Sequence, residues 1–368
     1  MLTKVEIKNI NAIIEATFDF AKCKYQYKNE MIYNNEVVSP IAFYGTNGSG
    51  KSSFLTAISQ LVSLLIDEPS QLRTFIPHFQ NVKKDNKVVL TTTGSSSIKL
   101  FFELKKNKYI YFIETSLKGY ISKEVLIKNN IELFNRSKTD YFYNNETNIV
   151  SSEMFPILRT LDIEKNDEEI HLCYEYLSSI GYIDASKKLY QLKAAKQKSY
   201  KDIIVEKSEE IKDILQKYKE FPLYEVHSST TEQGKKEFLA IIKHSGGELV
   251  LPWDLVSSGM QNQSLLLSAV LSLPENGLLI IDELEDALHP LTILDFIAAV
   301  KEKNVQLIFT SHNTYILQSL RPDQVFFAHW QEGFSKYKRL CDIYPNIREV
   351  NNIEKMYLSN LFTEDIKR

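Results

Sequence analysis

Residues 45–52 read Gly-Thr-Asn-Gly-Ser-Gly-Lys-Ser and fit the pattern Gly-x-x-x-x-Gly-Lys-Ser/Thr in full. The apolar run Ile41–Tyr44 precedes them and predicts a buried strand. The apolar residues that follow recur at helical spacing and are Phe54, Ala57, Ile58, Leu61, Leu64 and Leu65. A glycine-rich loop therefore joins a strand to a helix, which is the context that a phosphate-binding loop needs.

The residue types of this loop predict its chemistry. Glycines let backbone N–H groups turn toward phosphate oxygens, and the start of the following helix adds partial positive charge. We expect Lys51 to neutralise the β- and γ-phosphates of ATP and Ser52 to bind Mg²⁺. The other loop residues expected to contact the nucleotide are Asn47, Gly48, Gly50 and Ser53. A glycine turn without a ligand is the structural alternative.

Two further buried strands are predicted to end in polar residues. Asp282 and Glu283 follow the apolar run Leu278–Ile281, and His312 follows the run Val305–Phe309. Because strands alternate with helices here, we expect a parallel sheet that gathers these residues at one edge. Asp282 is predicted to bind Mg²⁺, Glu283 to act as general base on water, and His312 to contact the γ-phosphate or the water. Helix capping is the alternative role for the acidic pair.

The order of these motifs resembles the ABC-type ATPase superfamily. In that family a signature motif opens a helix between the phosphate loop and the acidic strand, and Ser258-Gly259-Met260-Gln261 is similar to it. Met260 stands where the family has a second glycine. The resemblance implies nucleotide contacts from Ser258, Gly259 and Gln261 across to a second copy. ATP would then clamp a head-to-head homodimer or a higher homo-oligomer.

The resemblance also implies a glutamine that contacts the metal and the water. Gln80 is the candidate for this metal-site residue, and Gln60 is the second choice. The separation of 205 positions between Ser52 and Ser257 is longer than in transporter subunits. A transporter motor is therefore disfavoured.

Other stretches indicate the branch of the superfamily. The segments Lys4–Ile10 and Asp282–Pro290 resemble SMC, RecF and OLD-like ATPases. Thr310–Asn313, followed by Arg321–Gln324, is similar to small stand-alone AAA-type ATPases of bacterial phage-defence and abortive-infection systems. This likeness covers about residues 1–115 and 235–330.

The expected fold class is α/β. It comprises an ABC-ATPase head with a mostly parallel phosphate-loop sheet, an antiparallel β lobe near the N-terminus, and a helical insert between phosphate loop and signature. The expected domains are residues 1–115 (N-terminal half of the head), 116–235 (largely helical insert that binds a partner or effector), 236–330 (C-terminal half of the head) and 331–368 (C-terminal extension). Within the insert, 116–150 is expected to be irregular or a hairpin, and 170–220 to be helical.

Composition excludes several classes of protein. The 368 residues are 43% hydrophobic and 25% charged, as in ordinary globular proteins, and the net charge of −3 gives no global basic field. The cysteines Cys23, Cys173 and Cys341 lie far apart without a Cys-x-x-Cys pair, so neither a zinc site nor a disulfide framework is expected. Without an apolar leader or a long apolar run, the sequence predicts a cytoplasmic protein that does not work at a membrane.

These observations imply a slow ATPase that acts as sensor or regulator in bacterial anti-phage defence, with a phage protein as trigger. The 56 residues that follow His312 are too few for a nuclease domain, so a nuclease or toxin effector is expected on a separate chain. One alternative is a RecF-like DNA-repair or recombination ATPase that binds nucleic acid through lysines between Lys187 and Lys219. Another is a scaffold that binds ATP without hydrolysing it because Met260 prevents closure.

Overall fold

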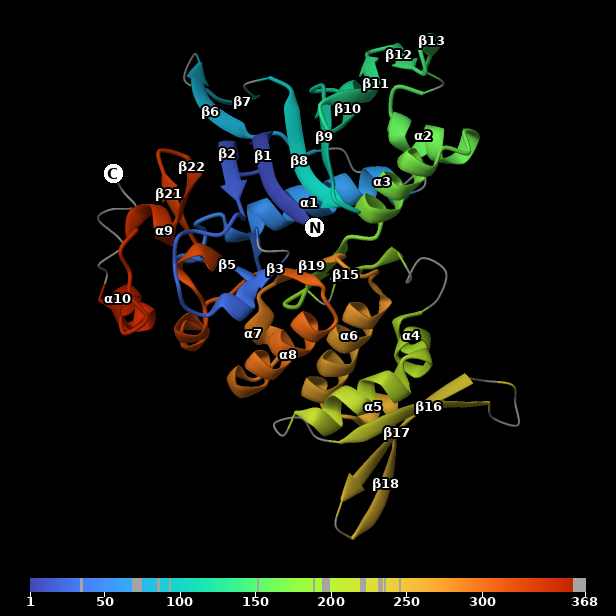
Figure 1. Cartoon of the computed structure of the whole chain (residues 1–368), viewed down its shortest axis with the longest axis vertical. Helices are drawn as coiled ribbons and strands as arrows, with labels where there is room; N and C mark the ends of the chain where they lie inside the picture. The colour runs from blue at the N-terminus through green and yellow to red at the C-terminus, as the bar shows by residue number, and fades with distance from the viewer. Residues whose placement is uncertain are drawn as a thin grey trace. The chain divides into compact units, whose positions relative to one another are not determined.

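The structure is a computed structural model and falls into two compact units (Figure 1). It describes residues 1–33, 36–67, 75–84, 87–92, 94–150, 152–187, 189–193, 199–218, 223–230, 234, 236–244 and 246–359. The first unit comprises Met1–Ser178 and Leu320–Arg368, and the second is Ser179–Ser319. The first unit is therefore built from two separate stretches of chain.

An eight-stranded antiparallel sheet occupies much of the first unit, in the order β13-β12-β11-β10-β9-β8-β1-β2. Its strands are β1 (Leu2–Ile10), β2 (Ile13–Asp19), β8 (Ser96–Leu104), β9 (Asn107–Thr115), β10 (Ile121–Lys128), β11 (Ile131–Ser137), β12 (Asp140–Tyr143) and β13 (Glu146–Ile149). Alternate residues of β8 and β9 are buried, so one face packs into the core. The predicted antiparallel lobe is confirmed, and it continues past residue 115 because β10–β13 extend the same sheet.

The phosphate loop lies between β5 (Ile41–Tyr44) and α1 (Lys51–Ile66) in this unit. β5 pairs in parallel with β21 (Val325–Gln331), which pairs antiparallel with β22 (Phe334–Arg339). Phe43 of β5 stacks on Phe54 of α1 and on Phe326 of β21, with ring centroids 4.8 and 5.2 Å apart. This aromatic core fixes the strand before the loop against the helix after it.

Shorter elements complete the first unit (Figure 1). They are η1 (Asn29–Met31), β3 (Ile32–Tyr33), β4 (Val37–Val38), β6 (Phe79–Lys84), β7 (Lys87–Thr92), α2 (Ile157–Glu164), α3 (Glu168–Ser178), η6 (Pro322–Gln324), α9 (Leu340–Ile343) and α10 (Ile353–Leu358). The segment expected to be a C-terminal extension thus contributes the paired strand β22 and two helices to this unit.

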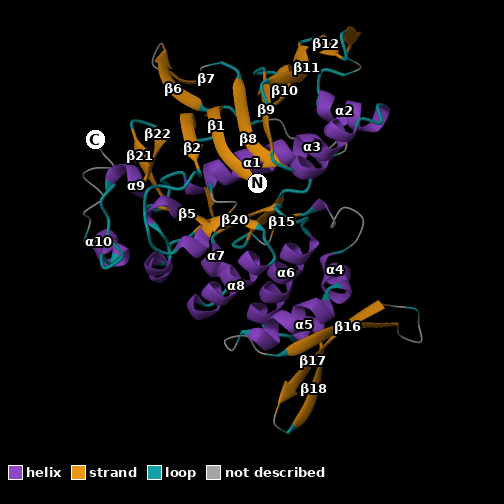
Figure 2. Ribbon diagram, viewed as in Figure 1, coloured by secondary structure: helices purple, strands orange, loops and turns teal. Residues whose placement is uncertain are grey.

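The second unit contains β14 (Gly181–Asp184), β19 (Leu278–Asp282) and β20 (Gln306–Thr310) as parallel neighbours, with β15 (Leu189–Gln191) antiparallel to β14. These three parallel strands and the parallel pair β5–β21 confirm the predicted mostly parallel core. All five residues of both β19 and β20 are buried. Figure 2 shows α6 (Ser258–Ser272), α7 (Leu284–Ala287) and α8 (Pro290–Glu302) together beside these strands.

The prediction of helix throughout 170–220 was wrong at 181–191, which forms β14 and β15. A buried strand of four residues gives too short an apolar run for periodicity to distinguish it from helix. Helices do occupy part of the predicted insert, as α4 (Tyr200–Glu206) and α5 (Ser208–Lys217). A three-stranded antiparallel sheet follows, with β16 (Tyr224–Thr230), β17 (Lys236–His244) and β18 (Gly247–Pro252). The short helices η4 (Trp253–Leu255) and η5 (Thr314–Ser319) complete the second unit.

Candidate nucleotide-binding site

Close packing beneath the phosphate loop requires two of its glycines. Gly50 has φ 94°, and a Cβ atom there would lie 1.8 Å from the Ser335 hydroxyl oxygen. A Cβ atom on Gly45 would lie 2.4 Å from the backbone oxygen of Ala328. Both contacts are far shorter than any side chain tolerates, so β21 and β22 approach the loop only because these positions are glycine.

The Lys51 ammonium group lies against the same loop. Its Nζ atom donates hydrogen bonds to the carbonyl oxygens of Gly45 and Thr46, at 3.0 and 3.2 Å. The Lys51 side chain is buried, whereas Thr46, Asn47 and Gly48 at the crest of the loop are exposed. A buried cation behind an exposed, glycine-rich crest suits a polyanionic phosphate chain, which would accept hydrogen bonds from the ammonium group and the loop amides.

Tyr337 of β22 contacts the first turn of α1. Its hydroxyl donates a 2.6 Å hydrogen bond to the Gly50 carbonyl oxygen. Burial raises the pKa of Tyr337 well above its usual value, so the phenol stays protonated and remains a donor. The sequence analysis missed Ser335 and Tyr337, because strand pairing over almost 300 positions leaves no local motif. Ser52 and Ser53 lie in the first turn of α1, where Ser53 N–H donates to the same carbonyl.

In the second unit, Asp282 and Glu283 share a contact with Thr310, which ends the neighbouring strand. The Thr310 hydroxyl donates to Asp282 Oδ1 at 2.5 Å and accepts from the Glu283 backbone N–H at 2.8 Å. The parallel pairing of β19 with β20 places these strand ends together, as the sequence predicted. Thr310 itself was not predicted as a site residue, although it stands two positions before His312.

Glu283 adopts a left-handed backbone conformation, with φ 54° and ψ 58°. For a residue with a Cβ atom this conformation costs about 1–3 kcal/mol and persists where the surroundings enforce it. The Thr310 hydrogen bond and the start of α7 directly after Glu283 fix it here. Strain at a proposed general base is typical of a functional position.

Acidic side chains gather around the turn that follows. Glu285 Oε1 accepts a 2.5 Å hydrogen bond from the backbone N–H of His312, which anchors the predicted histidine near α7. Burial, together with the negative charges of Glu283 and Glu285, raises the pKa of Asp286. The electrostatics of this turn therefore favour the protonated form of Asp286.

A second acidic residue, Asp184, lies at the end of β14 and opposite Asp282 in the strand register. It accepts hydrogen bonds from Lys187 Nζ at 2.7 Å and from the Ser186 hydroxyl at 2.8 Å. Burial alone would raise the pKa of Asp184, but these hydrogen bonds outweigh burial and lower it. The pKa of Lys187 is raised, chiefly by Asp184 and further by Asp282 and Glu283. An apolar run ending in Asp184 was the available signal, and the sequence analysis missed it.

The signature-like residues begin α6. Ser257 caps this helix by accepting the Met260 N–H at 3.4 Å, and Ser258 and Gly259 are exposed. Gln261 turns back and donates to the carbonyl oxygen of Trp253 at 2.7 Å. The Gln261 amide nitrogen thus holds η4 against α6, and a nucleotide contact from Gln261 stays a prediction.

The two glutamine candidates lie in different elements. Gln60, in α1, accepts a hydrogen bond from the backbone N–H of Ile76 at 3.3 Å. The backbone of Gln80 lies in β6, and its side chain falls outside the described part of the structure. The metal-site role of Gln80 therefore stays a prediction.

Four lysines between residues 200 and 217 contact carboxylates. The contacts are Lys201–Asp254 at 2.7 Å, Lys207–Glu210 at 2.9 Å, Lys212–Glu225 at 2.7 Å and Lys217–Glu302 at 2.6 Å. Paired lysines attract nucleic acid less strongly, because each carboxylate cancels charge that a phosphate would neutralise.

Residues 41–318 match the family model described as "AAA domain, putative AbiEii toxin, Type IV TA system". The chain belongs to this AAA family. The matched residues include the phosphate loop, the signature-like tetrapeptide, the acidic pair and His312. The predicted relationship to ATPases of abortive-infection systems is thus confirmed for this AAA domain.

Solved structures similar to this AAA domain include three SMC heads. The SMC head domain from Thermotoga maritima is 15% identical, with a TM-score of 0.48, covering 92% of this chain and 98% of that one. An SmcHead bound to the C-winged helix domain of ScpA is 13% identical, with a TM-score of 0.48, covering 92% and 97%. An Smc head with an extended coiled coil, bound to the C-terminal domain of ScpA derived from Pyrococcus furiosus, is 13% identical, with a TM-score of 0.47, covering 100% and 99%. No curated protein matches the chain. Among the described residues, no helix is long and apolar enough to cross a membrane.

Proposed function

We propose that this AAA domain binds and slowly hydrolyses ATP with Mg²⁺, and that its nucleotide state controls a separate nuclease or toxin in bacterial anti-phage defence. The observation that carries the ATPase proposal is the Lys51 ammonium group, held by the carbonyls of Gly45 and Thr46 behind an exposed loop crest. The family match, whose description includes a toxin of a toxin–antitoxin system, supports the regulatory part.

The site residues have separate roles in this proposal. Lys51 and the loop amides bind the phosphates, and the oxygen ligands for Mg²⁺ are Ser52 and Asp282. When bound, Mg²⁺ neutralises phosphate charge that builds up during transfer. Hydroxyl and carboxylate oxygens are ligands that suit this hard cation, and Thr310 keeps Asp282 oriented. Glu283 accepts a proton from the attacking water, and His312 hydrogen-bonds to the γ-phosphate or that water.

Nucleotide binding also assembles copies of the chain in this proposal. Ser258 and Gly259 are exposed at the start of α6, a helix of 15 residues, where backbone N–H groups favour an anion. A γ-phosphate held by one copy would contact these residues of another copy, giving an ATP-clamped homodimer or higher oligomer. A phage protein or the effector would bind one nucleotide state better than the other and shift that equilibrium. Residues 116–235 are the proposed binding region.

The test measures ATP binding and phosphate release with the purified chain. Lys51→Ala should lose ATP binding, because the phosphate charge is left uncompensated. Glu283→Gln should bind ATP as well as the parent and release phosphate about 10²–10⁴-fold more slowly, as expected for loss of a general base. The matched control is Glu237→Gln, at an exposed position of β17. Phosphate release that is absent in the parent, or unchanged in Glu283→Gln, would refute the enzymatic proposal.

A further inference from the structure

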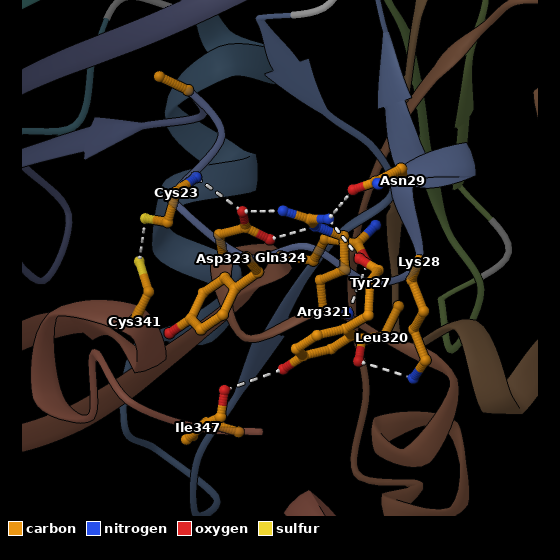
Figure 3. A network of polar contacts seen from close by, with 12 residues as sticks. Cys23, Tyr27, Lys28, Asn29, Leu320, Arg321, Asp323, Gln324, Cys341 and Ile347 are labelled. Carbon is orange, nitrogen blue, oxygen red and sulfur yellow. Dashed lines mark hydrogen bonds and ion pairs between the residues drawn. The ribbon is translucent and has the colours of Figure 1, made fainter. Parts of the chain in front are cut away.

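Two cysteines that are distant in sequence lie side by side in the first unit (Figure 3). The Sγ atoms of Cys23 and Cys341 lie 2.9 Å apart, although 318 positions separate the residues. Cys23 follows β2, and Cys341 lies in α9. The expectation of neither a zinc site nor a disulfide framework rested on the spacing and number of the cysteines, and spacing along the chain carries no information about this contact.

A buried ion pair holds the segment that carries Cys23. Asp323 Oδ2 accepts the Cys23 backbone N–H at 2.8 Å, and the same carboxylate accepts two 2.9 Å hydrogen bonds from Arg321. The side chains of Arg321 and Asp323 are fully buried. Arg321 also donates to the Tyr27 carbonyl oxygen at 2.5 Å (Figure 3). The backbone around Cys23 is therefore fixed by charge-assisted hydrogen bonds.

Arg339 connects this segment to the one that carries Cys341. It caps α9, two positions before Cys341. Its Nε atom donates to the Asp323 carbonyl oxygen at 2.7 Å, and its Nη2 atom donates to the Ala21 carbonyl oxygen at 2.6 Å. The two thiols are thus brought together by non-covalent contacts on both sides, so forming a bond between them costs little additional ordering.

The two thiols have different chemical environments. The hydrogen bond between the two sulfur atoms lowers the pKa of Cys23, and the positive charge of Arg339 lowers it further. The same hydrogen bond and burial raise the pKa of Cys341. Cys23 is partly exposed and Cys341 is buried. A partly exposed cysteine with a lowered pKa beside a buried cysteine with a raised pKa is the arrangement of an attacking and a resolving cysteine.

We propose that Cys23 and Cys341 form a reversible intramolecular disulfide when the chain meets hydrogen peroxide. The Cys23 thiolate attacks the peroxide, the O–O bond breaks, and a sulfenic acid forms while the leaving hydroxide takes up a proton as water. Cys341 then attacks the sulfenic sulfur, the S–S bond forms, and a second water leaves with the Cys341 proton. The two thiols lose two electrons in total, and the peroxide gains them. An S–S bond is about 2.05 Å long, so the sulfurs need to approach by only about 0.9 Å.

The experiment counts free thiols in the purified full-length chain after exposure to hydrogen peroxide, quenching and denaturation. The three cysteines should fall to one free thiol, and dithiothreitol should restore all three. Peptide mapping should recover one linked pair that contains Cys23 and Cys341. On a denaturing gel without reductant, the oxidised monomer should migrate faster, because the link closes a loop of more than 300 residues.

Variants assign the reaction to this pair. Cys23→Ser and Cys341→Ala should each abolish the fast-migrating monomer, whereas Cys173→Ser should leave it unchanged. Cys173 is a matched control because it is buried and its pKa is raised by that burial, which makes it unreactive. Three thiols persisting in excess peroxide, a link that includes Cys173, or a link between two chains would overturn the proposal. If a variant fails to fold, thiol counting and peptide mapping of the parent chain still decide whether this pair forms.

Discussion

The Tyr337 hydroxyl donates a 2.6 Å hydrogen bond to the carbonyl oxygen of Gly50, the residue that caps α1 and closes the phosphate loop. Ser335, on the same strand, fills the space that a side chain at position 50 would need. A strand near the end of the chain therefore supports a loop near its beginning. The shape of the phosphate loop depends on β22 as well as on its own sequence.

Removing the Tyr337 hydroxyl should weaken this support. Tyr337→Phe leaves the Gly50 carbonyl without this donor and should lower the free energy of unfolding by about 0.5–1.5 kcal/mol. We expect weaker ATP binding as well, because the loop is less well held. Titration with a fluorescent ATP analogue and denaturant unfolding measure the two effects. Tyr120→Phe, at an exposed tyrosine, is the control, and equal losses in both variants would contradict the assignment.

A methyl group at Gly50 should displace β22 from the loop. Gly50→Ala introduces a Cβ atom that meets Ser335 Oγ at 1.8 Å, in addition to the strain of φ 94°. Gly333 has nearly the same φ, 93°, but no atom lies within 4 Å of its would-be Cβ. Gly333→Ala therefore measures the strain alone, and Gly50→Ala should lose clearly more ATP binding and stability. Ser335→Gly should partly rescue Gly50→Ala, and a rescue that fails would show that packing against Ser335 is not the cause.

Trapping the ATP state should reveal the oligomer. Glu283→Gln, which is expected to bind ATP without turning it over, should shift to a dimer or larger species when ATP and Mg²⁺ are added. Light scattering during size-exclusion chromatography measures the mass. Adding Ser258→Arg to Glu283→Gln should return it to the monomer, because a bulky side chain blocks the exposed start of α6. If Glu283→Gln stays monomeric with bound ATP, the clamp model is wrong while ATP binding still stands.

The acid sensitivity of the second unit should depend on Glu225. Hydrogen bonds from Lys212 and Lys243 lower the pKa of Glu225 to about 2, from an ordinary value of 4.5. A carboxylate whose pKa is lower in the folded than in the unfolded state stabilises the fold fully at pH values above its unfolded-state pKa. This contribution is lost as the pH falls through 4.5 toward about 2. Glu225→Gln should therefore flatten the decline of Tm over that range. The control Glu237→Gln, on the neighbouring strand, should lose Tm with falling pH as steeply as the parent. If Glu225→Gln does the same, the ion pairs of Glu225 contribute nothing to stability.

DNA binding by the lysines between residues 200 and 217 should be weak. Four of these lysines already contact carboxylates at 2.6–2.9 Å. We expect no shift of a DNA duplex on a native gel at low salt, where electrostatic binding is strongest. Tight binding that falls steeply with added salt would instead favour the RecF-like alternative.

The sequence predicted the parts of the site that short motifs define. The phosphate loop and the acidic pair after a buried strand are local patterns, because each is formed by consecutive residues at the end of a predicted strand. The support from Tyr337, the Asp184–Lys187 pair and the contact of Cys23 with Cys341 were missed. Each depends on a strand pairing or a turn that brings distant or unremarkable residues together, and neither periodicity nor spacing records such contacts.

The parallel pairing of β5 with β21 has a consequence for synthesis of the protein. The strand that leads into the phosphate loop is made early, but its neighbour in the first unit and the supporting β22 are made only after residues 179–319. A nascent chain on the ribosome therefore has the complete loop sequence long before it has the residues that shape the loop. Translation products that stop before residue 320 should therefore be inert toward ATP, so truncated copies would not compete with the full-length chain for the nucleotide.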